Sequence, residues 1–179
     1  ADSAILSIIS TNTIDILMCF TDKGRMYKIL VDEVPEGNKF FPISGLTALE
    51  GEEKVIAVNS LFRKSKAQYV VFFTKIGLVK KTHLEEYMKM RCGKGIAAIK
   101  LADNDSIANV VFMDEEDAIL VTKQGMSIRF ETKSIAPIGR VSMGVKGIKL
   151  NDGDEVICGI PVKDNNSSIA IVTDIGLAK

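Results

Sequence analysis

The sequence of 179 residues predicts an all-β, propeller-like repeat protein, and three observations support this prediction. An apolar run followed by the pattern T-x-x-G occurs four times, and its glycines Gly24, Gly77, Gly125 and Gly176 are 53, 48 and 51 residues apart. Each unit of about 50 residues holds several short segments rich in β-branched and aromatic residues, which are typical of strands. The best helical candidate, His83 to Met90, is too short to change the class. Several strands in a unit of this size are typical of a propeller blade.

The apolar runs before the threonines are short and continuous, which predicts strands that are buried on both faces. Threonine at the first position and glycine at the fourth suit a type I turn followed by a left-handed residue, because glycine enters that region without a Cβ penalty. We therefore expect the four glycines to be structural turn residues with positive φ. The expected strands are residues 16–20, 70–73, 119–121 and 169–172.

A second recurring element is a glycine-rich basic segment. Arg91 to Leu101 matches Met143 to Leu150, and each segment leads through an acidic turn into another apolar strand. These second strands are expected at residues 5–9, 54–59, 107–113 and 156–162. The acidic turns include residues 103–105 and 152–155, where paired acids favour turn formation over metal binding.

The repeats divide the chain into about three four-stranded blades and two partial ones. We expect the end of a blade at 1–9, whole blades at 10–61, 62–113 and 114–162, and the start of a blade at 163–179. The two terminal pieces are complementary halves of one blade. They could pair and close a four-bladed ring, or the chain could be part of a larger propeller.

Composition and motifs argue against several function classes. No apolar run of about 18 residues and no charged-then-apolar amino terminus occurs, so a cytoplasmic location without membrane contact is the default expectation. Cys19, Cys92 and Cys158 are odd in number and far apart, which disfavours a disulfide framework or a zinc site. His83 is the single histidine, and no P-loop occurs. We expect no catalytic residue, no metal and no cofactor.

Charge distribution, rather than net charge, would have to support any binding to nucleic acid, because 23 basic residues balance 23 acidic ones. Bases recur after the turn glycines, and equivalent residues of a propeller form a belt around the ring. This first group comprises Arg25, Lys28, Lys80, Lys81, Arg129 and Lys179. A second group precedes the next strand and comprises Arg91, Lys94, Lys100, Arg140, Lys146 and Lys149. The alternative is that these bases are ordinary solvated residues at strand ends.

The segment from Gly77 to Tyr87, followed by Arg91 to Ile96, resembles the repeat of the gyrase A C-terminal domain. In that family a G-x-[VI]-K-[KR]-T-x-L-x-E-[YF] segment leads to a glycine-rich basic loop. Residues 125–130 and 137–148 resemble the following blade. The family's Q-R-R-G-G-[KR]-G box has only a degenerate match here, at Met90 to Gly95, so we expect the true box to precede Ala1.

The resemblance implies a hairpin-invaded propeller, or β-pinwheel, of six blades that wraps double-stranded DNA around its outer edge. It also implies that wrapping supports negative supercoiling by an A2B2 enzyme at the bacterial nucleoid, in which the remainder of gyrase A and the gyrase B subunit are the partners. The equivalent domain of topoisomerase IV and a protein-interaction propeller are the alternatives. The DNA-binding residues that we expect are Arg25, Lys28, Lys80, Lys81, Arg91, Lys94, Arg129, Arg140, Lys146 and Lys179.

Overall fold

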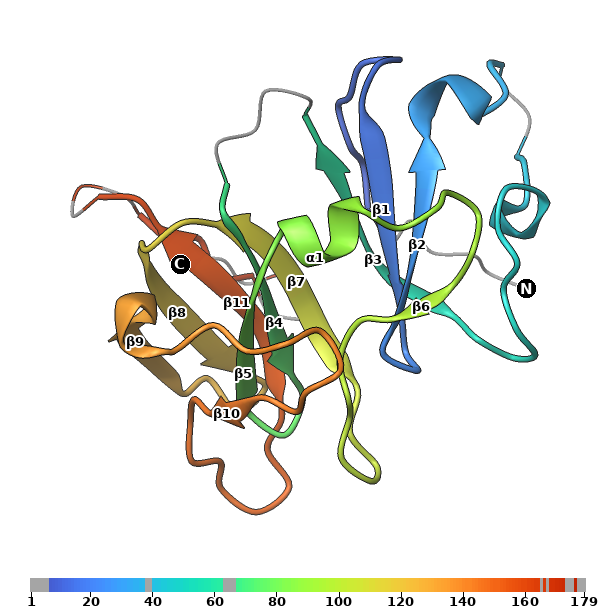
Figure 1. The fold of residues 1–179 in the computed structure, drawn as a ribbon. Helices are drawn as coiled ribbons and strands as arrows, with labels where there is room; N and C mark the ends of the chain where they lie inside the picture. Colours follow the sequence, from blue (N-terminus) through green and yellow to red (C-terminus); the bar gives the residue numbers. More distant parts are fainter. Residues whose placement is uncertain are drawn as a thin grey trace.

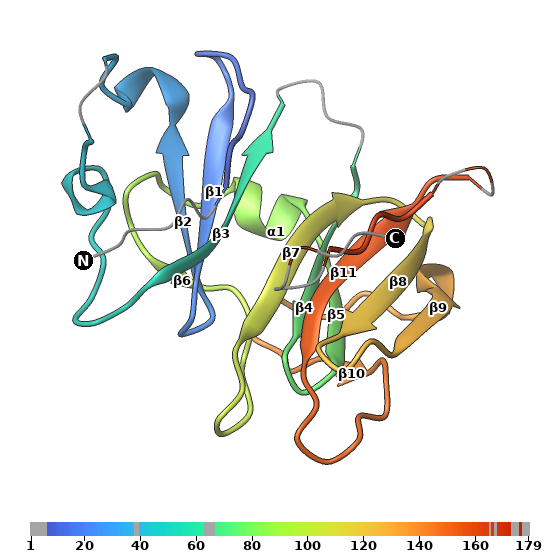
Figure 2. The ribbon, with the colours of Figure 1, turned by 180° about the vertical axis from the view of Figure 1, so that it is seen from behind.

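Three antiparallel sheets follow one another along the chain in a computed structural model, which describes residues 7–37, 40–62, 67–164, 166, 168–172 and 176 (Figures 1 and 2). The first repeat contributes β1 (Ile16–Thr21), β2 (Arg25–Leu30) and β3 (Val55–Leu61). The second contributes β4 (Tyr69–Thr74), β5 (Leu78–His83), β6 (Ile96–Ala97) and β7 (Ile107–Met113). The third contributes β8 (Asp117–Thr122), β9 (Ser127–Glu131), β10 (Val145–Lys146) and β11 (Val156–Val162). The all-β prediction is confirmed.

Helical structure is confined to short connections. The α-helix α1 (Glu85–Met88) lies within the helical candidate of the sequence and buries Tyr87. The described residues also form the 3-10 turns η1 (Val31–Glu33), η2 (Ile43–Gly45) and η3 (Thr132–Ser134). In the part of the chain that the structure describes, no helix is long and apolar enough to cross a membrane.

The T-x-x-G hairpins join the first two strands of each repeat. Gly24, Gly77 and Gly125 have φ values of +72°, +88° and +80°, as the turn interpretation predicts, and Gly176 has a φ of +80°. In the turns at Gly24, Gly77 and Gly125 the threonine accepts two hydrogen bonds. Its carbonyl accepts the glycine N–H, and in the second repeat the Thr74 hydroxyl also accepts the Leu78 N–H at 3.2 Å.

Each of the first two sheets is completed by a strand from the following repeat. The sheet orders are β3-β1-β2-β6 and β10-β5-β4-β7, so β6 of the second repeat pairs with β2, and β10 of the third pairs with β5. Within the described ranges the third sheet, β11-β8-β9, has three strands and β9 forms its outer edge. This exchange of edge strands is the hairpin invasion that the resemblance implies.

The last strand of each repeat, β3, β7 or β11, lies at the inner edge of its sheet, where the repeats meet. Asn59 on β3 donates its amide N–H to the Val110 carbonyl at 2.9 Å. Asn109 on β7 stands two positions earlier in its strand than Asn59 does in β3, and it bonds both backbone groups of Gly159, at 2.8 and 2.7 Å. These side-chain amides therefore join successive blades near the hub.

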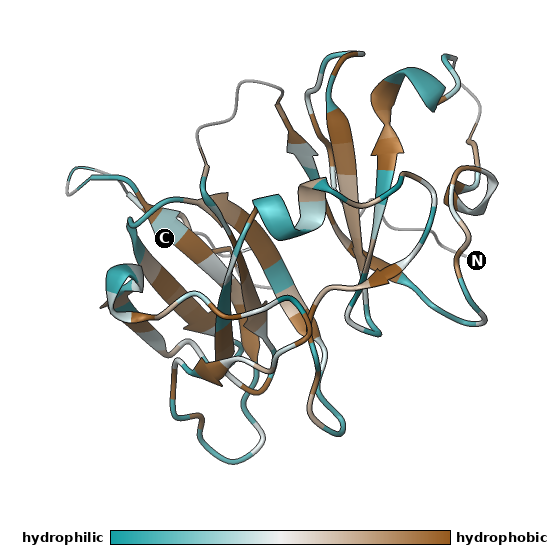
Figure 3. Cartoon of the chain, in the orientation of Figure 1, coloured by the Kyte–Doolittle hydropathy of each residue, from teal (hydrophilic) through white to brown (hydrophobic). Residues whose placement is uncertain are grey.

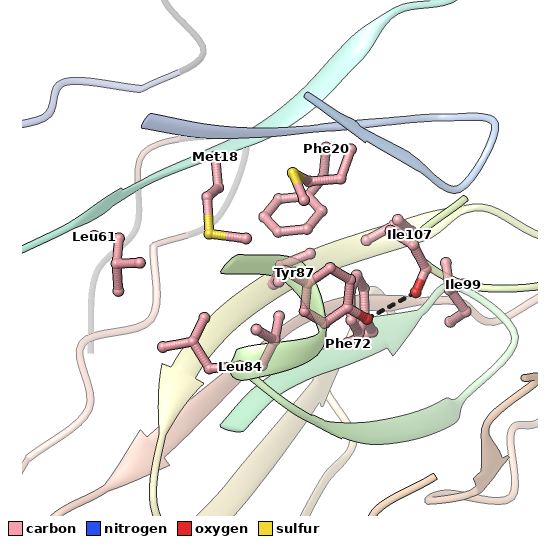
Figure 4. Close-up of a cluster of buried hydrophobic side chains, with 12 residues drawn as sticks. Met18, Phe20, Leu61, Phe72, Leu84, Tyr87, Ile99 and Ile107 are labelled. Atoms are coloured by element: carbon pink, nitrogen blue, oxygen red, sulfur yellow. Dashed lines mark hydrogen bonds between the residues drawn. The ribbon is translucent and has the colours of Figure 1, made fainter. Parts of the chain in front are cut away.

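The apolar core fills the spaces between blades rather than one central volume. Between the first two sheets, Phe20 and Phe72 meet edge to face with ring centroids 5.4 Å apart (Figure 4). Between the second and third sheets, Val71, Phe73 and Leu120 form a second cluster. Hydrophobic residues follow the strands and hydrophilic residues follow the connections (Figure 3). Each blade is thus stable only against its neighbours.

The sequence interpretation differs from the structure at both ends. The strand expected at 5–9 falls partly on residues 1–6, which lie outside the described residues, and residues 7–9 are not in a strand. Of the strand expected at 169–172, Val172 forms only an isolated bridge. Whether the terminal pieces pair to close a ring stays untested.

The turn glycines give a first test, since two of them share a backbone conformation but differ in their surroundings. A Cβ on Gly77 would lie 2.8 Å from Ile148 Cγ2 and 3.0 Å from the Ile148 carbonyl, whereas nothing lies within 4 Å of one on Gly125. We expect Gly125→Ala to cost about 1 kcal/mol through positive φ alone and Gly77→Ala about 2–4 kcal/mol. Urea unfolding of both variants measures the difference, and equal costs would contradict the packing described here.

The hub asparagines give a second test. Asn109→Ala leaves the Gly159 N–H and carbonyl without their side-chain partner, so we expect a loss of about 1–3 kcal/mol in the free energy of unfolding. Asn59→Ala removes one bond and is expected to cost less. Thermal unfolding monitored by circular dichroism compares the two variants. A larger effect of Asn59→Ala would show that the amides do not join the blades as described.

Candidate nucleic-acid interface

Three lysines of the predicted belt are buried. Lys28, Lys80 and Lys81 expose only 4%, 0% and 2% of their surface, so these three bases of the expected belt do not face solvent. The reason is strand exchange. The segment that follows β5 packs over β2 and covers Lys28. In the same way, the segment that follows β9 packs over β5 and covers Lys81.

Lys28 and Lys81 are equivalent residues, and each joins its own repeat to the following one. The Lys28 ammonium donates to the Met88 carbonyl at 2.7 Å, at the end of α1. The Lys81 ammonium donates to the Thr132 carbonyl at 2.9 Å and lies 4.7 Å from the centre of the Tyr69 ring. Burial lowers the pKa of both lysines. These two bases act inside the protein, where each holds a short helical segment of the following repeat.

Lys80 has the most complete set of partners. Its ammonium donates to the Ala98 and Arg140 carbonyls, both at 2.7 Å, and to the Tyr87 hydroxyl at 3.3 Å. The Tyr87 hydroxyl in turn donates to Ala98 O at 2.9 Å, the bond drawn in Figure 4. Three acceptors match the three N–H groups of an ammonium. Burial lowers the pKa of Lys80 to about 7, with Glu86 opposing and Arg140 adding to the shift.

The other bases of the first group are in different surroundings. Arg129 is equivalent to Lys28 and Lys81 but is exposed and donates to Asp117 at 2.7 Å, because no described segment pairs with the outer edge of β9. Arg25 is half-buried and forms ion pairs with Glu50 at 2.6 Å and Glu53 at 3.7 Å. Lys179 lies outside the described residues.

The second basic group stands on two loops that lie against the preceding repeat. In the loop before β6, the Gly93 N–H donates to the Lys28 carbonyl at 2.8 Å. In the loop before β10, the Ile138 N–H donates to the Lys81 carbonyl at 2.9 Å. Glycines permit this close approach, since a Cβ on Gly95 would lie 2.6 Å from the Tyr27 ring and one on Gly144 2.7 Å from the Val79 carbonyl.

The loop bases remain largely available to a ligand. Arg91, Lys94 and Lys146 are exposed, and in the described part of the chain none of them forms an ion pair. Arg140 is half-exposed and donates one guanidinium N–H to the Ala97 carbonyl. Two further exposed lysines follow the invading strands, Lys100 and Lys149. They are 49 residues apart, close to the repeat period, so they are equivalent residues of two successive repeats.

The acids of the recurring turns serve the hairpins. Asp105 accepts the Ile76 N–H at 3.2 Å, and Asp154 accepts the Gln124 N–H at 3.0 Å. Burial would raise the pKa of Asp154, but the Thr122 hydroxyl and two backbone N–H groups lower it by more. Among the described residues no group of three or more His, Cys, Asp or Glu side chains is arranged to hold a metal ion.

Antiparallel sheets that exchange their edge strands, with basic glycine-rich loops before the invading strands, define a β-pinwheel class of propeller domain. The chain belongs to the DNA gyrase C-terminal domain, beta-propeller family, whose sequence profile matches residues 15–61, 68–112 and 116–162. The family resemblance drawn from the repeat motifs is therefore confirmed.

Individual relatives agree with this assignment. The DNA gyrase A protein of Helicobacter pylori is 34% identical over 183 residues, which cover 99% of this chain and 22% of that protein. The crystal structure of the C-terminal domain of DNA topoisomerase IV aligns with a TM-score of 0.83 and 29% identity, over 97% of this chain and 55% of the other. The structure of a DNA gyrase A C-terminal domain aligns with a TM-score of 0.72 and 26% identity, over 86% of this chain and 50% of the other. The chain spans about a fifth of the length of the Helicobacter gyrase A protein.

The buried ammonium of Lys80 predicts a pH dependence of stability. In the unfolded chain this lysine keeps its proton up to its ordinary pKa of 10.5, whereas in the folded chain it loses the proton near pH 7. Between these values the unfolded state binds more protons, so the free energy of unfolding rises with pH, by at most about 1.4 kcal/mol per unit. We expect wild type to gain stability relative to Lys80→Met from pH 7 to pH 9.

Urea unfolding of the two proteins at several pH values tests this prediction, because titrations elsewhere in the chain cancel in the difference. If the difference in the free energy of unfolding between wild type and Lys80→Met does not change with pH, Lys80 has the same protonation state in the folded and unfolded chains, and the prediction is wrong.

Proposed function

We propose that this chain is a DNA-binding module of a gyrase A-type protein, and that it holds double-stranded DNA by its phosphates along the outer edge. The observation that carries the proposal is the pair of basic loops. Arg91 and Lys94 stand on one and Arg140 on the next, and each loop leads into the strand that forms the outer edge of the preceding sheet. Lys146 is the second residue of the strand after the second loop. Successive blades thus offer positive charge at successive points of a curved rim.

Contacts of this kind favour affinity without base recognition. Lysine and arginine at phosphates position the duplex and release counterions, and base edges are not required. A curved rim additionally favours sequences that bend at low cost. We therefore propose non-specific binding with bending, in which the exposed loop bases replace the buried lysines of the predicted belt.

The relatives support a proposal for the role of this module in the whole enzyme. We propose that wrapping by this module supports negative supercoiling by an ATP-dependent type II topoisomerase of the bacterial cytoplasm. Its partners in an A2B2 assembly would be the remainder of gyrase A and the gyrase B subunit. The module itself contributes no catalytic group in this proposal. The 29% identity to a topoisomerase IV domain keeps the equivalent role in that enzyme as the alternative.

Salt dependence of duplex binding tests the loops directly. Each phosphate contact contributes about −0.9 to the slope of log K against log salt. We expect Arg91→Ala with Lys94→Ala to flatten the slope by about 1.8, with nearly equal loss on unrelated sequences. The measurement is a fluorescence anisotropy titration of two duplexes at several salt concentrations.

Lys54→Ala with Lys163→Ala is the matched control, because both lysines are exposed but stand outside the basic loops. The control pair should leave the slope close to that of wild type. If it flattens the slope as much as the loop pair does, the attraction is diffuse and there is no ordered DNA path. If wild type does not bind duplex at low salt, the proposed function is wrong.

A further inference from the structure

One buried side chain joins the two basic loops. Ala98 directly follows the first loop and its strand β6, and Arg140 lies in the second loop. The Lys80 ammonium donates to both carbonyls at 2.7 Å, and none of its own surface is exposed. Loops that are more than 40 residues apart in the sequence are therefore held by the same cation.

Arg140 is held by the second repeat at three separate groups. Its N–H donates to Glu86 Oε2 at 2.8 Å, its carbonyl accepts from Lys80, and its guanidinium donates to the Ala97 carbonyl. Two residues later, the Ser142 carbonyl accepts the Lys100 N–H at 3.2 Å. Glu86, Ala97 and Lys100 lie on or near the surface, whereas Lys80 is the anchor inside the protein.

We propose that Lys80 is a positioning residue for DNA, which sets the distance and orientation between two successive phosphate-binding loops without contacting DNA. This inference rests on the proposed function, because it concerns the same loops. A bound duplex has phosphates at regular intervals, so two loops act together only if their spacing fits those intervals. A loose second loop would have to be ordered on binding, which costs affinity.

This link is particular to the junction of the second and third repeats. The equivalent residue of the first repeat is Tyr27, whose hydroxyl bonds Glu53 and the Ala48 carbonyl inside its own repeat. The equivalent residue of the third is Ile128. Lys81 crosses the same junction, but it bonds the Thr132 carbonyl in η3, ahead of the second loop. Lys81→Met is therefore a matched control: it removes a buried lysine without releasing a loop.

The first measurement is the distance between the loops in the full chain. Spin labels are placed at the native Cys92 and at Val141→Cys, which are exposed and one on each loop, with Cys19→Ser and Cys158→Ser removing the other thiols. We expect Lys80→Met to broaden the distance distribution by about twofold and Lys81→Met to leave it unchanged. Amide exchange at Arg140 and Ser142, corrected for intrinsic rates, should accelerate by about tenfold in Lys80→Met alone.

The second measurement is duplex binding by proteins with native cysteines. Loss of one productive contact should flatten the salt slope by about 0.9 in Lys80→Met, although Lys80 itself is inaccessible, and Lys81→Met should keep the slope of wild type. If Lys80→Met does not fold, Lys80→Gln retains an N–H donor and should show smaller changes in the same direction.

The outcomes separate the two claims. A folded Lys80 variant with unchanged loop distance and exchange overturns the positioning role. So does a variant with loosened loops that binds DNA as wild type does. Absence of duplex binding by wild type would refute the proposed function instead, while the distance measurement would still report whether Lys80 fixes the loops.

Discussion

The exchange of edge strands between repeats is the constraint on which the rest of the structure depends. β6 and β10 each complete the sheet of the preceding repeat, so neither of the first two blades is built from its own residues alone. The middles of β2 and β5 are buried, and with them the side chains of Lys28, Lys80 and Lys81. A buried charge is costly unless it is fully paired. A carbonyl of the following repeat accepts from each of the three lysines, so separating two repeats would leave Lys28 and Lys81 without these partners and Lys80 without one of its three.

Strand exchange also explains where the glycines and bases of the loops lie. A segment that lies flat on a neighbouring strand cannot carry Cβ atoms at the points of closest approach, which is why Gly95 and Gly144 are glycines. Other residues of the same loops face solvent and include the bases Arg91 and Lys94, and Arg140 is half-exposed. One short segment therefore provides both the connection between repeats and the charged surface, and a change that loosens the connection would also move the bases.

The sequence predicted the features that depend on local geometry and repetition. The T-x-x-G turns and the strands before them follow from local chemistry, and the described structure has both in the first three repeats. The exchange of strands came only from the family resemblance, because β6 and β10 have two residues each and carry no periodicity of their own. The repeat could not have matched the hub amides of Asn59 and Asn109, because they stand at different positions of their strands, and a lone polar residue in an apolar strand gives no partner by itself.

The buried lysines could not be distinguished from exposed ones by sequence reasoning, since a lysine at a strand end has the same pattern in both cases. Lys81 and Arg129 occupy equivalent positions, yet one is enclosed by the next repeat and the other is exposed. The difference arises outside the strand that carries them, in the segment that follows. A recurring base in such a propeller can therefore either hold two repeats together or contact a ligand. It is buried where carbonyls of the following repeat surround it, and it is open to a ligand where no segment covers it. The zero net charge is consistent with this division of roles. Acids accept hydrogen bonds in the turns, the buried lysines hold successive repeats together, and the bases of the loops are exposed or half-exposed at the surface.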